Sequence, residues 1–435
     1  MEALRVVPAI HYFDTFKEFN EAFQLGKRDP DWQLSLGGQT GDGESRRGQR
    51  KPAEQRKRGG REMEALRVVP AIHYFDTFKE FNEAFQLGKR DLLVTNQWMY
   101  DPYVKPLGIE LNVIFQEKFG SGEPSDEMID AMAAEMKKYD FDRIVAFGGG
   151  TIVDICKVLS LKVPERSVDL FTGAVKPEKL HHLVVVPTTC GTGSEVTNVA
   201  IAELKSLHTK KGLAVEETYA DEAVLVPESL QGLPDYVFAT SSIDALIHAI
   251  ESYLSPKASP FTEMYSRKAM EMIMEGYKKI LEKGNTKENR APYLKEFALA
   301  SNYAGIAFGN AGCAAVHALS YSIGGAFHVP HGEANYQFFT EVFKMYMRKA
   351  PEGKIAEANR IFAEMLGCGV ENVYEELDRF LGQLIGKKKL REYGMKEEQI
   401  EEFTKSTIEN QQRLLKNNYV FLTEEEIREI FAALY

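Results

Sequence analysis

The pattern of apolar residues divides the chain into a region where strands alternate with helices and a region of helices alone. Short apolar runs bounded by turn residues predict strands up to Pro227, with helical periodicity between several of them, as at 126–138 and 152–161. The predicted strands are 92–95, 113–115, 144–147, 183–186, 199–203 and 224–226. This alternation is typical of a mainly parallel sheet covered by helices, so we predict an α/β domain over residues 63–227.

After Pro227 no convincing strand pattern remains, and long helical periodicities follow one another. The predicted helices are 235–254, 261–283, 293–307, 313–323, 334–349, 354–366, 373–385 and 397–415. We therefore expect an α/β plus all-α chain, in which a Rossmann-like nucleotide-binding domain precedes a helical metal-binding domain over residues 228–435.

The N-terminal segment contains an unchanged duplication, because residues 1–29 recur as residues 63–91. A natural structural repeat diverges in sequence and continues along the chain. Residues 30–62 are rich in Gly, Arg and Gln and poor in apolar residues, so we expect them to be disordered. We interpret residues 1–62 as a duplicated segment and linker that arose as an artefact; a functional basic linker that binds polyanions is the alternative.

Two segments of the second region supply a candidate metal site. Asp244 and His248 lie four residues apart in the predicted helix 235–254, so both side chains project from one face. His317 lies in the next candidate helix, 313–323, and we expect the G-G-A-F-H-V-P-H turn to bring His331 back from a loop. One carboxylate and three imidazoles suit Fe(II) or Zn(II). A lone D-x-x-x-H pair is more often a surface pair, and the second segment favours a metal.

Two glycine-rich turns follow strands of the first region. The strand 144–147 ends in G-G-G-T at 148–151, where backbone N–H groups can approach a diphosphate at a helix N-terminus. The strand 183–186 runs into P-T-T-C-G-T-G-S-E at 187–195, the position where open α/β sheets bind ligands. Each turn alone fits an ordinary loop, whereas both together favour a nucleotide site.

In this order, G-G-G-T-x-x-D-x-x-K, P-T-T-C-G-T-G-S-E-V-T, D-x-x-x-H and H-x(13)-H resemble the iron-containing (group III) alcohol dehydrogenase family, from about Met63 to the end. The resemblance implies an NAD-dependent oxidoreductase with Fe(II), or alternatively zinc, held by Asp244, His248, His317 and His331. It further implies that Gly149, Gly150, Thr151 and Asp154 bind the cofactor diphosphate, and that Thr188, Thr189, Thr192 and Lys211 line the nicotinamide and ribose.

Three features depart from the family pattern, namely Asn96, Tyr321 and the stretch Gly122-Glu123-Pro124 in place of a common P-N-P, and the role of one histidine stays open. Asn96 ends a strand where many relatives have an acidic residue at the adenosine ribose, so we expect only a moderate preference for NAD over NADP. Tyr321 replaces a second histidine and is interpreted as a wall of the pocket, with a proton relay through its hydroxyl as the alternative. His328, three residues before His331, is either a group that supports the metal site or a simple loop residue.

More narrowly, V-H-A-L-S-Y-x-I-G-G, F-H-V-P-H-G-E-A-N-Y, S-N-Y-A-G-I-A-F-G-N-A-G and R-E-Y-G-M-K-E-E resemble the family members that act on 4-hydroxybutyrate. This implies the interconversion of 4-hydroxybutyrate and succinate semialdehyde, with Lys205, Lys210 or Arg413 as candidates to bind the substrate carboxylate. The alternatives are a general short-chain alcohol or diol dehydrogenase, a lyase similar to dehydroquinate synthase, and a non-catalytic metal-binding protein.

Composition agrees with a small-molecule enzyme. The net charge of -11 argues against nucleic acid as a partner, because such proteins need a basic face. No apolar run approaches the roughly 18 residues of a membrane span, and we see no signal peptide. The scattered cysteines favour reduced thiols. We expect a cytoplasmic enzyme without a membrane partner. We also expect a homo-oligomer, with a dimer as the first choice, that acts on a hydroxy acid or aldehyde.

Overall fold

The computed structural model describes residues 10–12, 63–207 and 209–435. It divides into two compact units, Met1–Arg67 and Val68–Tyr435. In the first unit, β1 (Ile10–Tyr12) pairs antiparallel with β2 (Met63–Leu66). The expected linker 30–62 and most of the first copy lie outside the described residues, so their interpretation as a disordered artefact stays a prediction.

The second unit begins with a parallel sheet of six strands in the order β3-β10-β7-β6-β4-β5. Its strands are β3 (Ala71–Tyr74), β4 (Asp91–Thr95), β5 (Asn112–Phe115), β6 (Arg143–Gly148), β7 (His182–Pro187) and β10 (Glu222–Leu225). β3 was not predicted, because its short A-I-H-Y sequence lacks the continuous apolar run of the other strands.

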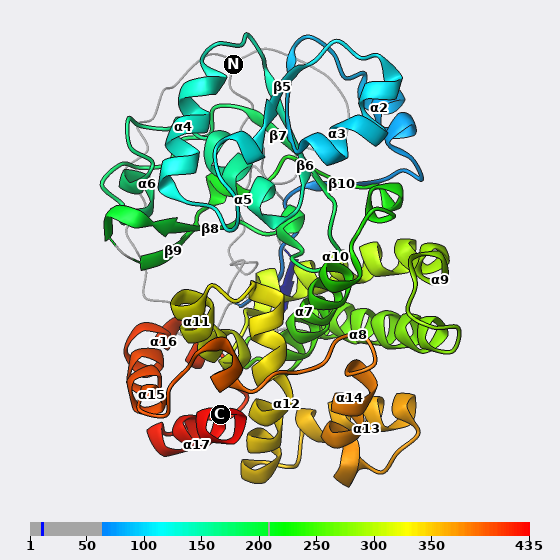
Figure 1. Ribbon diagram of the computed structural model, residues 1–435, viewed down its shortest axis with the longest axis vertical. Coiled ribbons are helices and arrows are strands. Elements are labelled where there is room, and N and C mark those ends of the chain that lie inside the picture. The colour runs from blue at the N-terminus through cyan, green and yellow to red at the C-terminus, as the bar shows by residue number, and fades with distance from the viewer. Residues whose placement is uncertain (1–9, 13–62, 208) are drawn as a thin grey trace, which may run out of the picture. The chain divides into compact units, whose positions relative to one another are not determined.

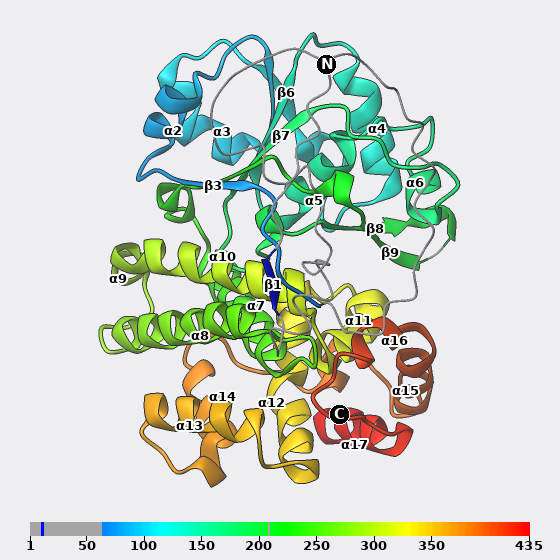
Figure 2. The ribbon, with the colours of Figure 1, turned by 180° about the vertical axis from the view of Figure 1, so that it is seen from behind.

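Successive residues of the central strands are buried on opposite faces of this sheet. The helices of this region are α2 (Phe78–Phe85), α3 (Gln97–Tyr103), α4 (Asp126–Met136), α5 (Gly150–Leu159) and α6 (Val168–Thr172). Leu92 and Val94 pack in a cluster with α4 and α5, whereas Leu93 packs in another cluster with α2 and α3. Figures 1 and 2 show this sheet with its helices from two opposite sides. Burial on both faces explains the apolar runs from which the strands were predicted.

The strand predicted at 199–203 is present, but it lies outside the main sheet. β8 (Val199–Leu204) pairs antiparallel with β9 (Thr209–Ala214) in a separate sheet of two strands. Buried Ala200, Ala202 and Leu204 alternate with partly exposed residues along β8. This alternation is typical of a strand with only one covered face, in contrast to the runs of the main sheet.

Residues after Pro227 form helices and no strand within the described part of the chain, as expected (Figure 1). The longer ones are α7 (Asp235–Leu254), α8 (Pro260–Leu281), α10 (Leu294–Ala311), α11 (Ala315–Phe327), α12 (His331–Lys349), α13 (Lys354–Leu366), α14 (Val373–Leu381), α15 (Gln399–Asn410) and α17 (Glu424–Leu434), with the short α9 (Lys287–Arg290) and α16 (Gln412–Leu415). The Rossmann-like region followed by a helical region is thus confirmed. The predicted helix 397–415 is two helices, and α17 was missed.

The boundary expected at residue 227 stays a prediction, because residues 68–435 form one compact unit. At the centre of the helical region, α7 is buried almost all round, which suits a helix with apolar residues on every side. None of the helices in the described residues is long and apolar enough to cross a membrane.

Candidate metal and nucleotide site

Four side chains from three helices meet in one cluster. Asp244 and His248 lie one turn apart on α7, His317 lies in α11, and His331 lies at the start of α12. One ligand atom from each of these four residues lies within 4.8 Å of the others. The first three are buried and the His331 side chain is 36% exposed, so the cluster opens on the His331 side.

The expectation that His331 lies on a loop is wrong. Gly324 and Gly325 lie inside α11 and do not end it, and the chain reverses between Phe327 and His331. His328 permits this reversal with a left-handed backbone, φ 53°, and Pro330 precedes the first residue of α12. The side chain of His328 is exposed, and its role in supporting the metal site stays a prediction.

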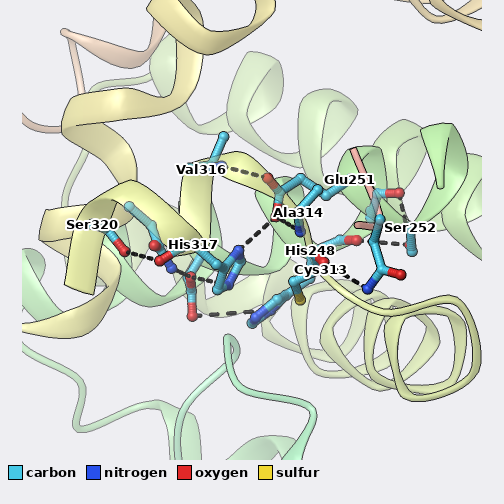
Figure 3. Close-up of polar contacts among 12 residues, drawn as sticks. His248, Glu251, Ser252, Cys313, Ala314, Val316, His317 and Ser320 are labelled. Carbon is cyan, nitrogen blue, oxygen red and sulfur yellow. Dashed lines mark hydrogen bonds and ion pairs between the residues drawn. The ribbon is translucent and has the colours of Figure 1, made fainter. Parts of the chain in front are cut away.

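Glu251 orients His317 and was missed at the sequence level. Its carboxylate accepts hydrogen bonds from the backbone N–H groups of Ala314 (2.9 Å) and Val316 (2.7 Å) at the start of α11. It also lies 2.6 Å from Nδ1 of His317 (Figure 3). A proton on Nδ1 leaves Nε2 as the free lone pair, as in carboxylate–histidine–metal arrangements. Glu251 follows His248 by three residues on α7, which is the signal that could have identified it.

Asp244 and His248 are each oriented by a hydrogen bond as well. Asn335 on α12 donates from Nδ2 to Oδ1 of Asp244 over 2.7 Å. Nδ1 of His248 lies 3.2 Å from the carbonyl oxygen of Gly191, so a proton there leaves the other ring nitrogen free. Gly191 belongs to the loop that follows β7, so one hydrogen bond joins the glycine-rich loop to the cluster.

The protonation of the histidines suits a metal. Burial lowers the pKa of His248 to about 3, so this imidazole is neutral near neutral pH. Burial favours the protonated form of Asp244, but the histidines and Asn335 outweigh it and hold the pKa of its carboxyl below the usual range. Burial lowers the pKa of His317 as well, yet Cys313 and Glu251 outweigh it and raise the pKa well above its usual value. Metal binding should therefore release a proton from His317.

An unpartnered atom supports the same assignment. Nε2 of His317 is buried and has no hydrogen-bond partner among the described residues. Such an atom loses the hydration of the unfolded chain without compensation. A divalent metal bound to the cluster would use this lone pair, so the donor set fits Fe(II) or Zn(II).

The glycine-rich turn at 148–151 lies at the end of β6. Gly149 precedes α5 as its N-cap, and Gly150 is the first residue of the helix. A Cβ atom on Gly150 would lie 3.1 Å from Cγ2 of Thr192, in the loop that follows β7. The buried hydroxyl of Thr189 in that loop has no partner among the described residues. A bare helix N-terminus beside an unpaired hydroxyl fits a diphosphate and its ribose.

Several other candidate cofactor residues form hydrogen bonds within the protein or lie exposed on its surface. Asp154 accepts hydrogen bonds from the Ser194 hydroxyl (2.8 Å) and the Ile201 N–H (3.0 Å). Thr151 donates to the carbonyl oxygen of Gly122 over 3.0 Å. Thr188 is buried beside the turn, and its N–H donates to the Gly148 carbonyl. Lys211 lies exposed on β9. Their contacts with a cofactor stay predictions.

The described cysteines form no disulfide, as expected. Burial raises the pKa of the Cys190 thiol to about 11, so it is protonated near neutral pH. Cys190 is therefore a buried structural side chain and no nucleophile.

Comparisons with known proteins agree with this geometry. The family described as Iron-containing alcohol dehydrogenase matches residues 72–227, and the Fe-containing alcohol dehydrogenase family, C-terminal, matches residues 238–435. The chain is 53% identical over 373 residues to 4-hydroxybutyrate dehydrogenase of Clostridium kluyveri, covering 86% of this chain and 100% of that protein. It is 33% identical over 324 residues to Long-chain-alcohol dehydrogenase 1 of Geobacillus thermodenitrificans, covering 72% and 80%.

A solved structure shows the same fold. Sulfoacetaldehyde reductase from Bifidobacterium kashiwanohense, in complex with NAD+, superposes with a TM-score of 0.72 at 21% identity. The superposition covers 85% of this chain and 98% of that chain.

Proposed function

Because the chain belongs to the iron-containing alcohol dehydrogenase family, we propose that it interconverts 4-hydroxybutyrate and succinate semialdehyde with NAD(H). The observation that carries this proposal is the identity of 53% to a 4-hydroxybutyrate dehydrogenase over the full length of that relative. We further propose Fe(II), with zinc as the alternative, at Asp244, His248, His317 and His331. The homodimer and the cytoplasmic location expected from the sequence stay predictions.

The residues of the site fall into groups that would bind the metal, orient its ligands or bind the cofactor. Bound to this cluster, the metal would act as a Lewis acid toward the substrate oxygen, and the nicotinamide would accept or donate hydride. Glu251 and Asn335 hold His317 and Asp244 in place. Gly149 and Gly150 leave room for the diphosphate, and Thr189 offers its free hydroxyl to the cofactor. The Gly191 carbonyl ties this loop to His248, so the two halves of the site keep a fixed relation.

A substrate carboxylate needs a cation near the open side of the cluster, because an unpaired buried carboxylate is costly. Burial lowers the pKa of His331, and among the nearby charges Lys210 lowers this pKa whereas Glu123 raises it. Burial raises the pKa of the Tyr321 phenol, and the charge of Arg413 acts in the opposite direction. The Tyr321 and His331 rings lie 6.2 Å apart, so Lys210 and Arg413 each act electrostatically on one of two neighbouring rings.

The candidate cations differ in their present partners. Lys210 pairs with Glu123 over 2.5 Å, and Lys205 forms an exposed pair with Glu127 over 2.8 Å. Arg413 has no ion-pair partner in the described part of the chain and is exposed. We therefore infer that Arg413 and Lys210 bind the substrate carboxylate, and that Lys205 serves only the surface.

A substrate panel tests the proposed function. With NAD, the wild type should use 4-hydroxybutyrate with far higher kcat/KM than 3-hydroxybutyrate, 1-butanol, 1,3-propanediol or glycerol. Arg413→Gln should raise KM for 4-hydroxybutyrate about tenfold or more, because it removes one charged hydrogen bond, and should leave 1-butanol unchanged. Lys205→Gln is the matched control and should change neither.

Two outcomes would overturn the proposal. If 1-butanol or a diol matched 4-hydroxybutyrate in kcat/KM, the protein would be a general short-chain alcohol or diol dehydrogenase. If the alcohol gave no net NADH, a lyase similar to dehydroquinate synthase, which would reoxidise its cofactor within each turnover, would replace the dehydrogenase.

A further inference from the structure

Three parallel strands end side by side at the edge that carries the glycine turn. Thr95 of β4 pairs with Phe115 of β5, and β4 also pairs with β6, which leads into Gly149. A dinucleotide whose diphosphate lies at the turn extends its adenosine ribose toward the ends of the neighbouring strands. The residues directly after β4 and β5 therefore face the ribose region.

The carboxylate of Glu117 is held at this edge by two donors. Its Oε1 accepts a hydrogen bond from the backbone N–H of Gln97 over 2.8 Å, and its Oε2 accepts one from Nδ2 of Asn96 over 2.9 Å. Glu117 belongs to the short 3-10 helix Gln116–Lys118 that follows β5, and its side chain is partly exposed. It is thus fixed in place and still accessible to a ligand.

Asn96 anchors this carboxylate. Its side chain is 7% exposed, and its amide also donates to Oε1 of Gln116 over 3.3 Å. Both hydrogen bonds that the Asn96 amide donates are directed toward the segment after β5. The residue at the end of β4 therefore supplies no charge itself but holds the charge that the next strand supplies.

No basic side chain neutralises Glu117 in the part of the chain that the structure describes. Lys118, the nearest basic residue in sequence, has its Nζ 5.0 Å from the centre of the Phe115 ring. Both donors that Glu117 uses are uncharged. The Glu117 carboxylate therefore has no ion-pair partner among the described residues.

We propose that Glu117 makes this protein select NAD over NADP. Its carboxylate accepts a hydrogen bond from a ribose hydroxyl of NAD and repels the additional phosphate of NADP. This inference rests on the proposed function only in taking a nicotinamide dinucleotide as the cofactor. It replaces the moderate preference that Asn96 alone would give with a strong one.

The test compares dissociation constants of NAD and NADP, measured by calorimetry on the full, metal-loaded chain. In Glu117→Gln, NADP should bind about tenfold more tightly or better, and NAD a few times more weakly. The glutamine oxygen can still accept from Gln97, so α3 keeps its N-terminal bond. Glu117→Asp keeps the charge and should retain most of the NAD preference.

Two further comparisons separate charge from structure. Glu110→Gln removes an exposed carboxylate before β5, where Glu110 pairs with Lys89, and should leave the ratio of the two constants unchanged. In the wild type, added salt should reduce the discrimination against NADP, and in Glu117→Gln it should not. Equal changes for both nucleotides in Glu117→Gln, or the same shift in Glu110→Gln, would overturn this inference. If the wild type bound neither nucleotide, the proposed function itself would fail.

Discussion

Glu251 shows how one residue prepares a ligand without binding the metal. Its side chain is 1% exposed, and it accepts bonds from two backbone N–H groups at the start of α11 as well as lying 2.6 Å from His317. Unpaired N–H groups at a helix start attract negative charge, so the start of α11 fixes the Glu251 carboxylate, which in turn orients the His317 imidazole.

Replacing this carboxylate should weaken the metal site. Glu251→Gln puts an amide donor where only donors point, so His317 loses its orientation and a backbone N–H loses its acceptor. We expect metal affinity to fall about ten- to a hundredfold, the usual range for such supporting residues. Competition with a chelator measures this affinity directly.

The control is Glu357→Gln, which removes a carboxylate that accepts from the Tyr253 hydroxyl in the same region. It should leave the metal affinity unchanged. An unchanged affinity in Glu251→Gln, with the fold intact by circular dichroism, would contradict the role of Glu251.

Sequence reasoning identified the residues of the cluster but not those that hold them. Asp244 and His248 were predictable because a helix places residues four apart on one face. Asn335 and Gly191 were not, because each acts through a contact between elements distant in sequence. A pattern along one element carries no signal of such a contact.

At the scale of elements, the start of α5 depends on the small size of Gly150. A Cβ atom at this position already meets Thr192 at 3.1 Å. A branched side chain would push against the loop after β7 and cover the N–H groups at the helix start, where a diphosphate needs close backbone approach.

Gly150→Val should therefore weaken NAD and NADP alike, by about tenfold or more, without loss of bound metal. Calorimetric titration with each nucleotide and metal analysis of the same sample measure both quantities. Gly386→Val is the control, because a Cβ atom at Gly386 meets nothing within 4 Å and its backbone is not left-handed. Undiminished nucleotide binding in Gly150→Val would remove the glycine turn from the site.

The elements were predictable where one physical signal dominated. The ends of α7 and α13 agree with the predicted 235–254 and 354–366, since each has clear helical periodicity and a definite stop. The sheet that β8 joins was not predictable, because an apolar run does not indicate the partner of a strand. The alternation of buried and partly exposed residues in β8 nevertheless differs from the buried runs of the main sheet. The predicted loop position of His331 is wrong because Gly324 and Gly325 do not end α11, which continues to Phe327.

At the scale of the whole second unit, the loop after β7 and the helical region are joined by close backbone contact. A Cβ atom on Gly193 would lie 2.4 Å from Cα of Gly305 on α10. Together with the bond from His248 to the Gly191 carbonyl, this contact leaves little freedom between the loop and the metal cluster. Hydride transfer requires such fixed placement of the two reacting groups.

The central claim is that the metal held by Asp244, His248, His317 and His331 is required for oxidation of 4-hydroxybutyrate by NAD. The direct measurement is NADH formation from 4-hydroxybutyrate against bound Fe(II) per chain, for the stripped and reloaded wild type and for Asp244→Ala. Wild-type activity should rise in proportion to metal up to one ion per cluster. Asp244→Ala should stay inactive yet bind NAD like the wild type, because the hydrogen bond of Asp244 is to Asn335 on α12 and the glycine turn lies on other elements. Full activity in the metal-free wild type would contradict the account.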